Sequence, residues 1–391
     1  ENGKASVALK GNFQVHPAAI EVGVERVTPV VRVMREDDNM TVIPWTNADH
    51  FTCNEKFQGE FEVTLEIPAG GPYRIDTSLE TKSTVPDLTW LYRGDCVLHL
   101  GVGNLFIIAG QSNSAGYSRD FCIDPPSMDV HLYRNRSKWD IASHPMNEST
   151  FAGSLANEEM GVPGVSPYLA FGKTYGKMTG MPVGLIQTSL GGSPMERWNP
   201  KDGDLYLNMV DKIHETGGRY AGVLWYQGCS DTNPGPAEKY LEHFREYVEA
   251  TRKELGYEIP FFTMQLNRQI NGINDECWGM VRDAQARAAK EIPGVSVLTT
   301  SNLSLCDGIH NTAQANVALG EKLAKQCAHV LNGKEEYQPP ELVKVERADE
   351  AERKSFQLKG SGIWLKLTCD HVKNCFLVYS AVGKDSGFTL T

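Results

Sequence analysis

Four short stretches, far apart in the sequence, contain the residue types that nucleophilic catalysis uses. In the first, Ser112 follows the apolar run 105–109, which predicts a buried strand. Gly110 permits a sharp turn, so Ser112 is expected just past the carboxyl end of that strand. Open α/β sheets hold their ligands at this position. Ser112 is therefore a candidate nucleophile, and the alternative is an ordinary polar turn.

The second stretch pairs an acid with an imidazole. Asp307 and His310 stand three residues apart, just before an expected helix. The carboxylate can bind one ring nitrogen of His310, which leaves the other free to take a proton from Ser112 and return it to a leaving group. Asp211 and His214 have the same spacing, but they lie within an expected helix, where such pairs are ordinary surface partners. The pattern favours Asp307 and His310.

Two further strand ends offer hydrogen-bond donors for a negatively charged intermediate. Gly191 and Gly192 follow the expected strand 182–188, and their N–H groups can approach a ligand without a side chain in the way. Gln227 follows the expected strand 221–226 and offers a neutral amide donor. The alternatives are a plain tight turn for the glycines and, for Gln227, hydrogen bonding to the loop backbone.

Other common signatures are missing from the sequence. No G-x-S-x-G motif occurs, which disfavours an ordinary α/β-hydrolase nucleophile elbow. Neither a phosphate-binding Walker A loop nor a G-x-G-x-x-G dinucleotide motif is found, and the cysteines show no zinc-ligand spacing.

The hydrophobic pattern predicts the elements that position these stretches. Between residues 101 and 338, short apolar runs alternate with amphipathic segments, which predicts a five-stranded parallel sheet of flavodoxin-like order with helices on both faces. Strands are expected at 105–109, 182–188, 221–226, 259–265 and 295–300. Helices are expected at 166–178, 204–216, 237–255, 278–291 and 312–330.

The two ends of the chain have β character. Residues 1–100 predict a small β-sandwich accessory domain that ends near Gly94. Residues 339–391 contain extended runs at 362–367 and 376–379, and so short a segment is expected to pack on the other domains. The predicted domains are therefore 1–100, 101–338 and 339–391.

The connection between Ser112 and the first expected helix is some fifty residues long and rich in Pro, Asn, Asp and Ser. It includes Trp139, His144 and Pro145. Because long irregular loops in compact domains are usually functional, we expect a wall or lid over Ser112. The alternative is a surface loop without a role.

Composition restricts the partners. The net charge is −11, the pI is about 5.5 and no Lys/Arg cluster of four or more occurs, which argues against nucleic acid or an anionic membrane. No apolar run approaches the ~18 residues of a membrane helix. The nine cysteines form no C-x-x-C pair and are expected to be free, mostly buried thiols. The compartment stays open, secreted or periplasmic if a leader was removed and otherwise cytoplasmic, as does the oligomeric state.

In their order along the chain, these stretches resemble the sialate O-acetylesterase-like carbohydrate esterases, a branch of the SGNH hydrolase superfamily. The resemblance covers about residues 60–330, including Ala-Gly-Gly-Pro-Tyr at 69–73. It implies a three-layer α/β/α domain that removes acetyl groups from sugars without a metal or cofactor. The blocks are Gly-Gln-Ser-Asn at 110–113, Gly-Gly-Ser-Pro at 191–194 with Arg197 and Trp198, Trp-Tyr-Gln-Gly at 225–228, and Asp-Gly-Ile-His at 307–310.

The resemblance assigns roles by position. It implies that Ser112 is the nucleophile, His310 the base and Asp307 the partner that orients the base. The implied oxyanion donors are the backbone N–H groups of Ser112, Gly191 and Gly192 and the side chain of Gln227. The implied substrate-binding residues are Gln111, Asn113, Arg197 and Trp198.

Two positions depart from the family pattern. Ser114 stands where the family usually has Met, and Cys229 stands where it usually has Glu. The second change removes a charge near the site and bears on substrate preference more than on catalysis.

Two alternatives to a sialate esterase stay open. One is an esterase for acetylated plant polysaccharide such as xylan. The other, from a different class, is a non-catalytic carbohydrate-binding protein, in which Trp139, Trp198 and Trp225 stack on sugars. In each case the expected partner is a sugar or glycan.

Overall fold

The computed structural model describes residues 3–21, 23–84, 90–148, 155–270, 272–333, 341–355 and 364–370. The chain divides into two compact units, Glu1–Ala324 and Lys325–Thr391. The first unit contains both the N-terminal β-rich segment and the α/β segment with the candidate site residues.

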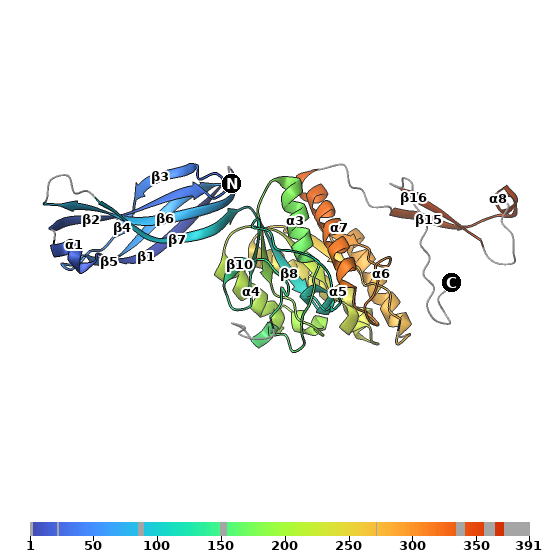
Figure 1. Ribbon diagram of the computed structural model, residues 1–391. Helices are drawn as coiled ribbons and strands as arrows, with labels where there is room; N and C mark the ends of the chain where they lie inside the picture. Colours follow the sequence, from blue (N-terminus) through green and yellow to red (C-terminus); the bar gives the residue numbers. More distant parts are fainter. Residues whose placement is uncertain are drawn as a thin grey trace. The chain divides into compact units, whose positions relative to one another are not determined.

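The α/β segment, which runs from β8 to α7 (Figure 1), is built on a seven-stranded sheet of order β10-β9-β11-β8-β12-β13-β14. All neighbouring strands are parallel except β9 and β10. The strands are β8 (Asn104–Gly110), β9 (Val130–Tyr133), β10 (Trp139–Ile141), β11 (Val183–Gln187), β12 (Tyr220–Tyr226), β13 (Phe261–Met264) and β14 (Val295–Leu298). The five expected strands are all present and pair in the flavodoxin-like order.

The expected count of five strands is wrong for this sheet, because β9 and β10 extend it to seven. Both additional strands come from the long connection after Ser112, which the sequence analysis interprets as an irregular lid. They contain only four and three residues, too few for a periodic pattern to stand out. Seven residues of the connection thus belong to the sheet, while residues 149–154 of it lie outside the described residues.

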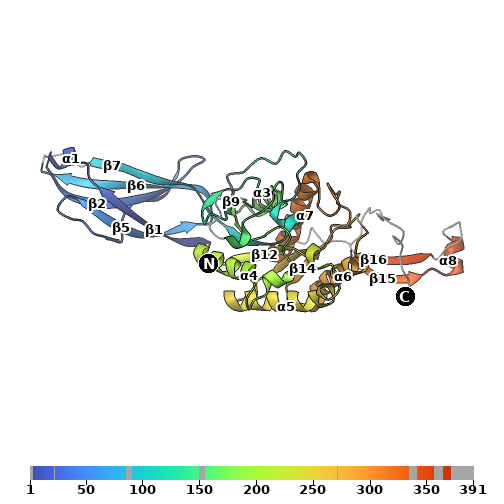
Figure 2. The same cartoon turned by 90° about the horizontal axis from the view of Figure 1, so that it is seen from below.

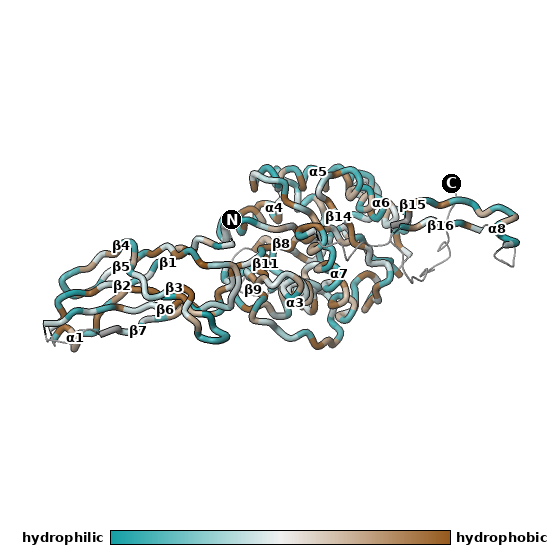
Figure 3. The backbone as a smooth tube through the Cα atoms, turned by 90° about the horizontal axis from the view of Figure 1, so that it is seen from above, coloured by the Kyte–Doolittle hydropathy of each residue, from teal (hydrophilic) through white to brown (hydrophobic). Residues whose placement is uncertain are grey.

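Helices cover both faces of this sheet (Figures 2 and 3). Alternation along β8 directs Ile107 to one face, where it shares a hydrophobic cluster with side chains of α4, α5 and α6. Phe106 faces the other way and packs edge-on against Phe171 of α3 with ring centroids 5.0 Å apart. Gly320 of α7 lies against the backbone of α3. The helices are α2 (Ser112–Ala115), α3 (Tyr168–Thr179), α4 (Asp204–Thr216), α5 (Pro236–Leu255), α6 (Asp275–Glu291) and α7 (Ala313–Asn332).

The N-terminal segment forms two antiparallel sheets, of order β1-β5-β4 and β3-β2-β6-β7. Their facing side chains share one hydrophobic cluster, to which Val33 and Val63 contribute. The expected exit near Gly94 is wrong, because β7 continues to Val102. The elements are β1 (Lys4–Gln14), α1 (Pro17–Glu21), β2 (Val24–Arg35), β3 (Thr41–Asn47), β4 (His50–Phe51), β5 (Gln58–Pro68), β6 (Gly70–Ser83) and β7 (Trp90–Val102).

The second unit contains the end of α7, the antiparallel pair β15 (Glu341–Arg347) and β16 (Leu365–Asp370), and α8 (Glu350–Ser355). The expected extended run 376–379 lies outside the described residues, and the packing of 339–391 on other domains stays a prediction.

The cysteines are only partly as expected. The eight that the structure describes are free, as expected, but only Cys277 and Cys327 are buried. Across the described ranges, no helix combines the length and apolar character needed to cross a membrane.

Candidate active site

Ser112 lies at the start of α2, directly after the carboxyl end of β8. Gly110 makes this turn possible, since its φ is +132° and a Cβ there would lie 2.3 Å from the carbonyl oxygen of Tyr226. Ser112 is 4% exposed, and its Oγ lies 2.8 Å from Nε2 of His310. A hydroxyl at this distance can hand its proton to a neutral imidazole.

Asp307 holds the other side of His310. Its Oδ2 lies 2.6 Å from Nδ1 of the imidazole, and its Oδ1 accepts the backbone N–H groups of Ile309 and His310 at 2.9 and 2.7 Å. Partial burial alone would raise the pKa of Asp307, but these hydrogen bonds outweigh it and the pKa lies below its usual value. The carboxylate therefore stays ionised and fixes Nδ1 as the protonated ring nitrogen. The structure thus brings Ser112, His310 and Asp307 together.

The side chain of Asn113 connects α2, which carries Ser112, with the loop that carries His310. Its Oδ1 accepts the N–H of Asn311 at 3.0 Å and its Nδ2 donates to the carbonyl of Ile309 at 3.2 Å. The side chain is 2% exposed. The expected substrate-binding role of Asn113 is therefore replaced by a structural one, in which it fixes the loop of His310 against α2.

Gln227 and Gln111 are also bound within the protein. The amide nitrogen of Gln227 donates to the carbonyl of Ser193 at 3.1 Å and to the carboxylate of Asp231. The amide oxygen of Gln111 accepts the N–H of Gly228 at 2.9 Å. The amide nitrogen of Gln111 lies 3.4 Å from Oγ of Ser230, to which it donates. Both amide nitrogens therefore have acceptors within the protein, and neither is a free donor in this structure.

The two glycines of the 191–192 turn differ. The N–H of Gly191 donates to Oε2 of Glu159 at 3.0 Å. The turn leaves open space around Gly192, where φ is +69°. Among the described residues, no acceptor lies within hydrogen-bond distance of the N–H of Gly192 or of Ser112. These two N–H groups are the unpaired candidates for an oxyanion.

The side chains of Arg197 and Trp198 both interact with other parts of the protein. Arg197 pairs with Asp204 at 2.6 Å and donates to the carbonyl of Ala156. Trp198 is fully buried, lies edge-on to Trp225 at 5.1 Å and donates its indole N–H to Ser193. Stacking on a sugar is therefore excluded for Trp198 and for Trp225, which is also fully buried. Trp139 is 44% exposed.

Trp198→Ala is expected to destabilise the protein by about 3–5 kcal/mol, because it leaves a cavity among buried aromatic side chains. The Michaelis constant of the folded fraction should stay within about twofold. Denaturant unfolding and steady-state kinetics check this, with Trp198→Phe as the milder variant. A tenfold higher KM at unchanged stability would contradict this and indicate that Trp198 binds substrate.

Ser114 and Cys229 occupy the two positions that depart from the family pattern. Ser114 is fully buried, and its Oγ lies 3.1 Å from the carbonyl of Ala109 and 2.7 Å from the hydroxyl of Tyr168. Cys229 is partly exposed as a residue, but the protein shields its thiol from water, which raises the pKa of the thiol to about 12; the carboxylates of Asp231 and Asp307 add to the effect. Ser114 thus supports α2 from beneath, while Cys229 places a neutral thiol close to Asp307.

Behind the 191–192 turn lies a network of buried polar side chains. Lys212 of α4 is 2% exposed, and its Nζ donates to the carbonyl of Gln187 at 2.7 Å and to Oδ1 of Asn135 at 3.0 Å. Asn135 in turn donates to Asn147 at 2.5 Å, and Asn147 donates to Glu159 at 2.9 Å. The network connects α4 with the turn that carries the unpaired N–H of Gly192.

Burial lowers the pKa of Lys212 to about 8, although Glu215 and Glu148 act in the opposite direction. Between that value and the unfolded pKa of about 10.4, the unfolded chain binds a proton that the folded chain does not. The free energy of unfolding, measured relative to Lys212→Met, should therefore rise by up to about 1.4 kcal/mol per pH unit from pH 8 to 10. Denaturant titrations of both proteins check this, and a difference independent of pH would contradict it.

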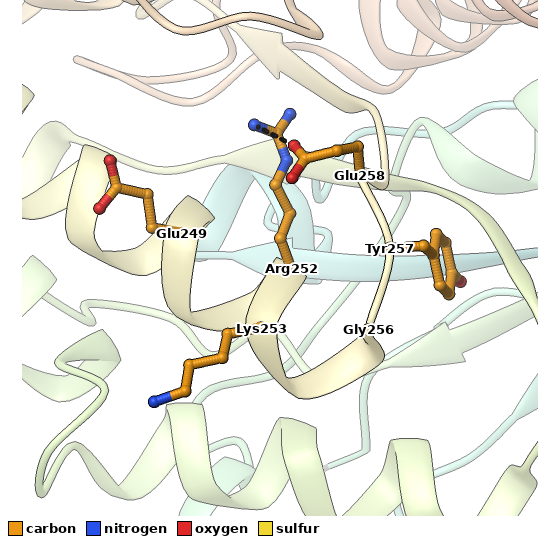
Figure 4. Close-up of a pocket in the computed structure, with 6 residues that line it drawn as sticks. All are labelled: Glu249, Arg252, Lys253, Gly256, Tyr257 and Glu258. Carbon is orange, nitrogen blue, oxygen red and sulfur yellow. Dashed lines mark ion pairs between the residues drawn. The ribbon is translucent and has the colours of Figure 1, made fainter.

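A hollow on the surface lies before the amino end of β13 (Figure 4). It is lined by the end of α5 and the segment that leads into β13, whereas Ser112 and Gln227 follow the carboxyl ends of strands. Arg252 and Glu258 turn toward one another there and form an ion pair at 3.1 Å. Arg252 also donates to backbone carbonyls, so its charge stabilises the fold. Within the described residues, no three His, Cys, Asp or Glu side chains gather into a metal site.

Comparison with known proteins identifies the family. The sequence profile described as "Carbohydrate esterase, sialic acid-specific acetylesterase" matches residues 102–329, more than half of the chain. The chain belongs to this family. The match covers all seven strands of the sheet, from β8 to β14, and it includes Ser112, Asp307 and His310.

Individual relatives agree with membership of the acetylesterase family. A probable carbohydrate esterase of Arabidopsis thaliana is 26% identical over 245 residues, which are 56% of this chain and 88% of the relative. A crystal structure of an Arabidopsis thaliana protein matches 59% of this chain and 99% of its own, at 25% identity and a TM-score of 0.51. A carbohydrate acetylesterase from Xanthomonas citri shares the fold over 88% of this chain and 76% of its own, at 21% identity and a TM-score of 0.54.

Proposed function

We propose that this member of the acetylesterase family is a serine esterase that removes O-acetyl groups from carbohydrate. The observation that carries the proposal is the chain of contacts from Ser112 through His310 to Asp307, at 2.8 and 2.6 Å. Such a chain activates a hydroxyl as nucleophile and supplies a base that later acts as acid.

In the proposed reaction, Oγ of Ser112 attacks the acetyl carbonyl while Nε2 of His310 takes the hydroxyl proton. The resulting oxyanion accepts hydrogen bonds from the N–H groups of Ser112 and Gly192, the two expected donors for which no hydrogen bond is found among the described residues. Collapse of the intermediate expels the sugar oxygen, which receives the proton from His310. Water, deprotonated by the same imidazole, then attacks the acyl carbon. Acetate leaves as the bond to Oγ of Ser112 breaks, and His310 returns the proton to that oxygen.

We further propose residues 101–338 as the esterase domain, residues 1–100 as a β-sandwich accessory domain and residues 339–391 as a C-terminal β segment. The two sheets that share one hydrophobic cluster support the β-sandwich. The range of the family match supports the esterase domain.

The proposed substrate is an O-acetylated sialic acid, since the family is described as sialic acid-specific. Acetylated xylan or another plant polysaccharide is the second candidate, and a relative named as a probable carbohydrate esterase comes from a plant, Arabidopsis thaliana. Acetate release from acetylated sialate, xylan and manno-oligosaccharides discriminates between them. Release from sialate alone supports the first candidate, and preferential release from xylan supports the second. Sugar binding without any acetate release would instead indicate a non-catalytic carbohydrate-binding protein.

A further inference from the structure

Glu159 is a buried carboxylate beside the proposed site that the sequence analysis does not single out. It is 3% exposed and accepts three hydrogen bonds. Its Oε1 accepts the hydroxyl of Tyr117 at 2.5 Å, while Oε2 accepts the N–H of Gly191 at 3.0 Å and the side-chain amide of Asn147 at 2.9 Å. Among the described residues, no cationic side chain lies within ion-pair distance of it.

A buried carboxylate without a cation is costly, and only donated hydrogen bonds compensate for it. Two of the three donors to Glu159, the N–H of Gly191 and the hydroxyl of Tyr117, belong to residues next to proposed catalytic groups. The N–H of Gly191 belongs to the turn whose next residue, Gly192, carries the unpaired N–H. The ring of Tyr117 lies against the imidazole of His310, with centroids 5.3 Å apart and planes 30° apart.

We propose that Glu159 is a positioning residue, which holds the oxyanion turn with one oxygen and the ring of Tyr117 against His310 with the other. The inference rests on the proposed function, because it assigns the alignment of that same site. An oxyanion donor is effective only when it lies about 3 Å from the developing charge. If the 191–192 turn shifts, the enzyme therefore binds the transition state more weakly, while its binding of the substrate changes less. The proton-accepting imidazole loses its neighbouring ring at the same time.

Three variants separate the two contacts. Glu159→Ala removes both acceptor oxygens and with them all three hydrogen bonds. Glu159→Gln keeps one oxygen for the N–H of Gly191, and Tyr117→Phe keeps the ring but removes its hydroxyl. The expected losses in kcat for p-nitrophenyl acetate are about 100-fold, about 10-fold and about 5-fold, with KM within about threefold. Partial rescue by Gln is the signature of positioning. Asp76→Asn is the matched control, a buried carboxylate of the β-rich segment that binds Arg32 and Arg74. It should lower the melting temperature but leave kcat within twofold.

The rate at which a fluorophosphonate labels Ser112 separates the two proposals. If wild type is labelled and Glu159→Ala is labelled at least tenfold more slowly, both stand. Equal labelling rates and equal kcat overturn the role of Glu159 and leave the esterase proposal intact, whereas no labelling of wild type overturns the esterase proposal. If Glu159→Ala does not fold, kcat and the melting temperature of Glu159→Gln and Tyr117→Phe test the role of Glu159 instead. Reduced kcat at unchanged melting temperature in both supports the role, and unchanged kcat in both overturns it.

Discussion

Ser112→Ala is expected to lower kcat for p-nitrophenyl acetate by at least about 10³-fold, with little change in the stability of the protein. The hydroxyl is the only group of Ser112 that contacts His310, and no other hydrogen bond from this side chain is found in the described structure. Removing it therefore takes away the nucleophile without opening a cavity. Residual activity would come only from the oxyanion donors and from substrate binding.

Ser114→Ala is the matched control for this variant. Ser114 lies on the same short helix, and within the part of the chain that the structure describes its hydroxyl hydrogen-bonds the carbonyl of Ala109 and the hydroxyl of Tyr168 but not His310. Its loss is expected to destabilise the protein by about 1–3 kcal/mol while kcat stays within about threefold. If Ser112→Ala kept more than a tenth of the wild-type kcat, or if Ser114→Ala had the larger effect, the nucleophile would be assigned to the wrong residue.

His310→Ala is expected to lower kcat/KM by about 10³-fold or more, whereas His214→Ala should change it less than twofold. His310 contacts Ser112 and Asp307, and removing its ring deletes both the base and the later acid. The ring of His214 is largely exposed and contacts Glu254 at 2.9 Å on the neighbouring helix. Exposed pairs of this kind contribute little to stability.

Steady-state kinetics of both variants, with circular dichroism to establish that each is folded, measure this difference. Added imidazole should restore part of the activity of His310→Ala, because a small base can enter the space left by the ring. The reverse order of effects would mean that the pair at 211–214, and not the pair at 307–310, serves the nucleophile.

The sheet could be predicted because five of its strands are short apolar runs that end in glycine or polar residues. Buried parallel strands leave this pattern in a sequence without help from tertiary context. Ser112 and His310 could be found for the same reason, since each is placed by the end of an element. The short sequences of β9 and β10 do not predict strands, because β9 forms by pairing with β11 and β10 by pairing with β9.

The direction of a side chain was harder to predict than its position. Gln227 and Asn113 do follow strands that meet at the expected edge, but each binds a neighbouring loop of the protein. Trp198 follows the Gly-Gly turn and could equally have faced a sugar, yet it packs against Trp225 in the core. Which polar or aromatic groups stay free depends on long-range partners, and no pattern within one stretch contains that information.

The contact between Glu159 and Tyr117 is a second example of a long-range partner that the sequence does not predict. They are 42 residues apart and meet through one hydrogen bond within the long connection after Ser112. That connection was expected to be functional because of its length, but its short segments gave no reason to select either residue. The contact with the N–H of Gly191 becomes visible only when the turn and the connection are folded together.

The most direct test is to map the residue that a fluorophosphonate labels in the full chain, by intact mass and peptide mass spectrometry. A single adduct on Ser112, formed rapidly in wild type and at least about 100-fold more slowly in His310→Ala, is the predicted result. An adduct on another serine, or the same rate in both proteins, would contradict the claim that Ser112 is a nucleophile activated by His310.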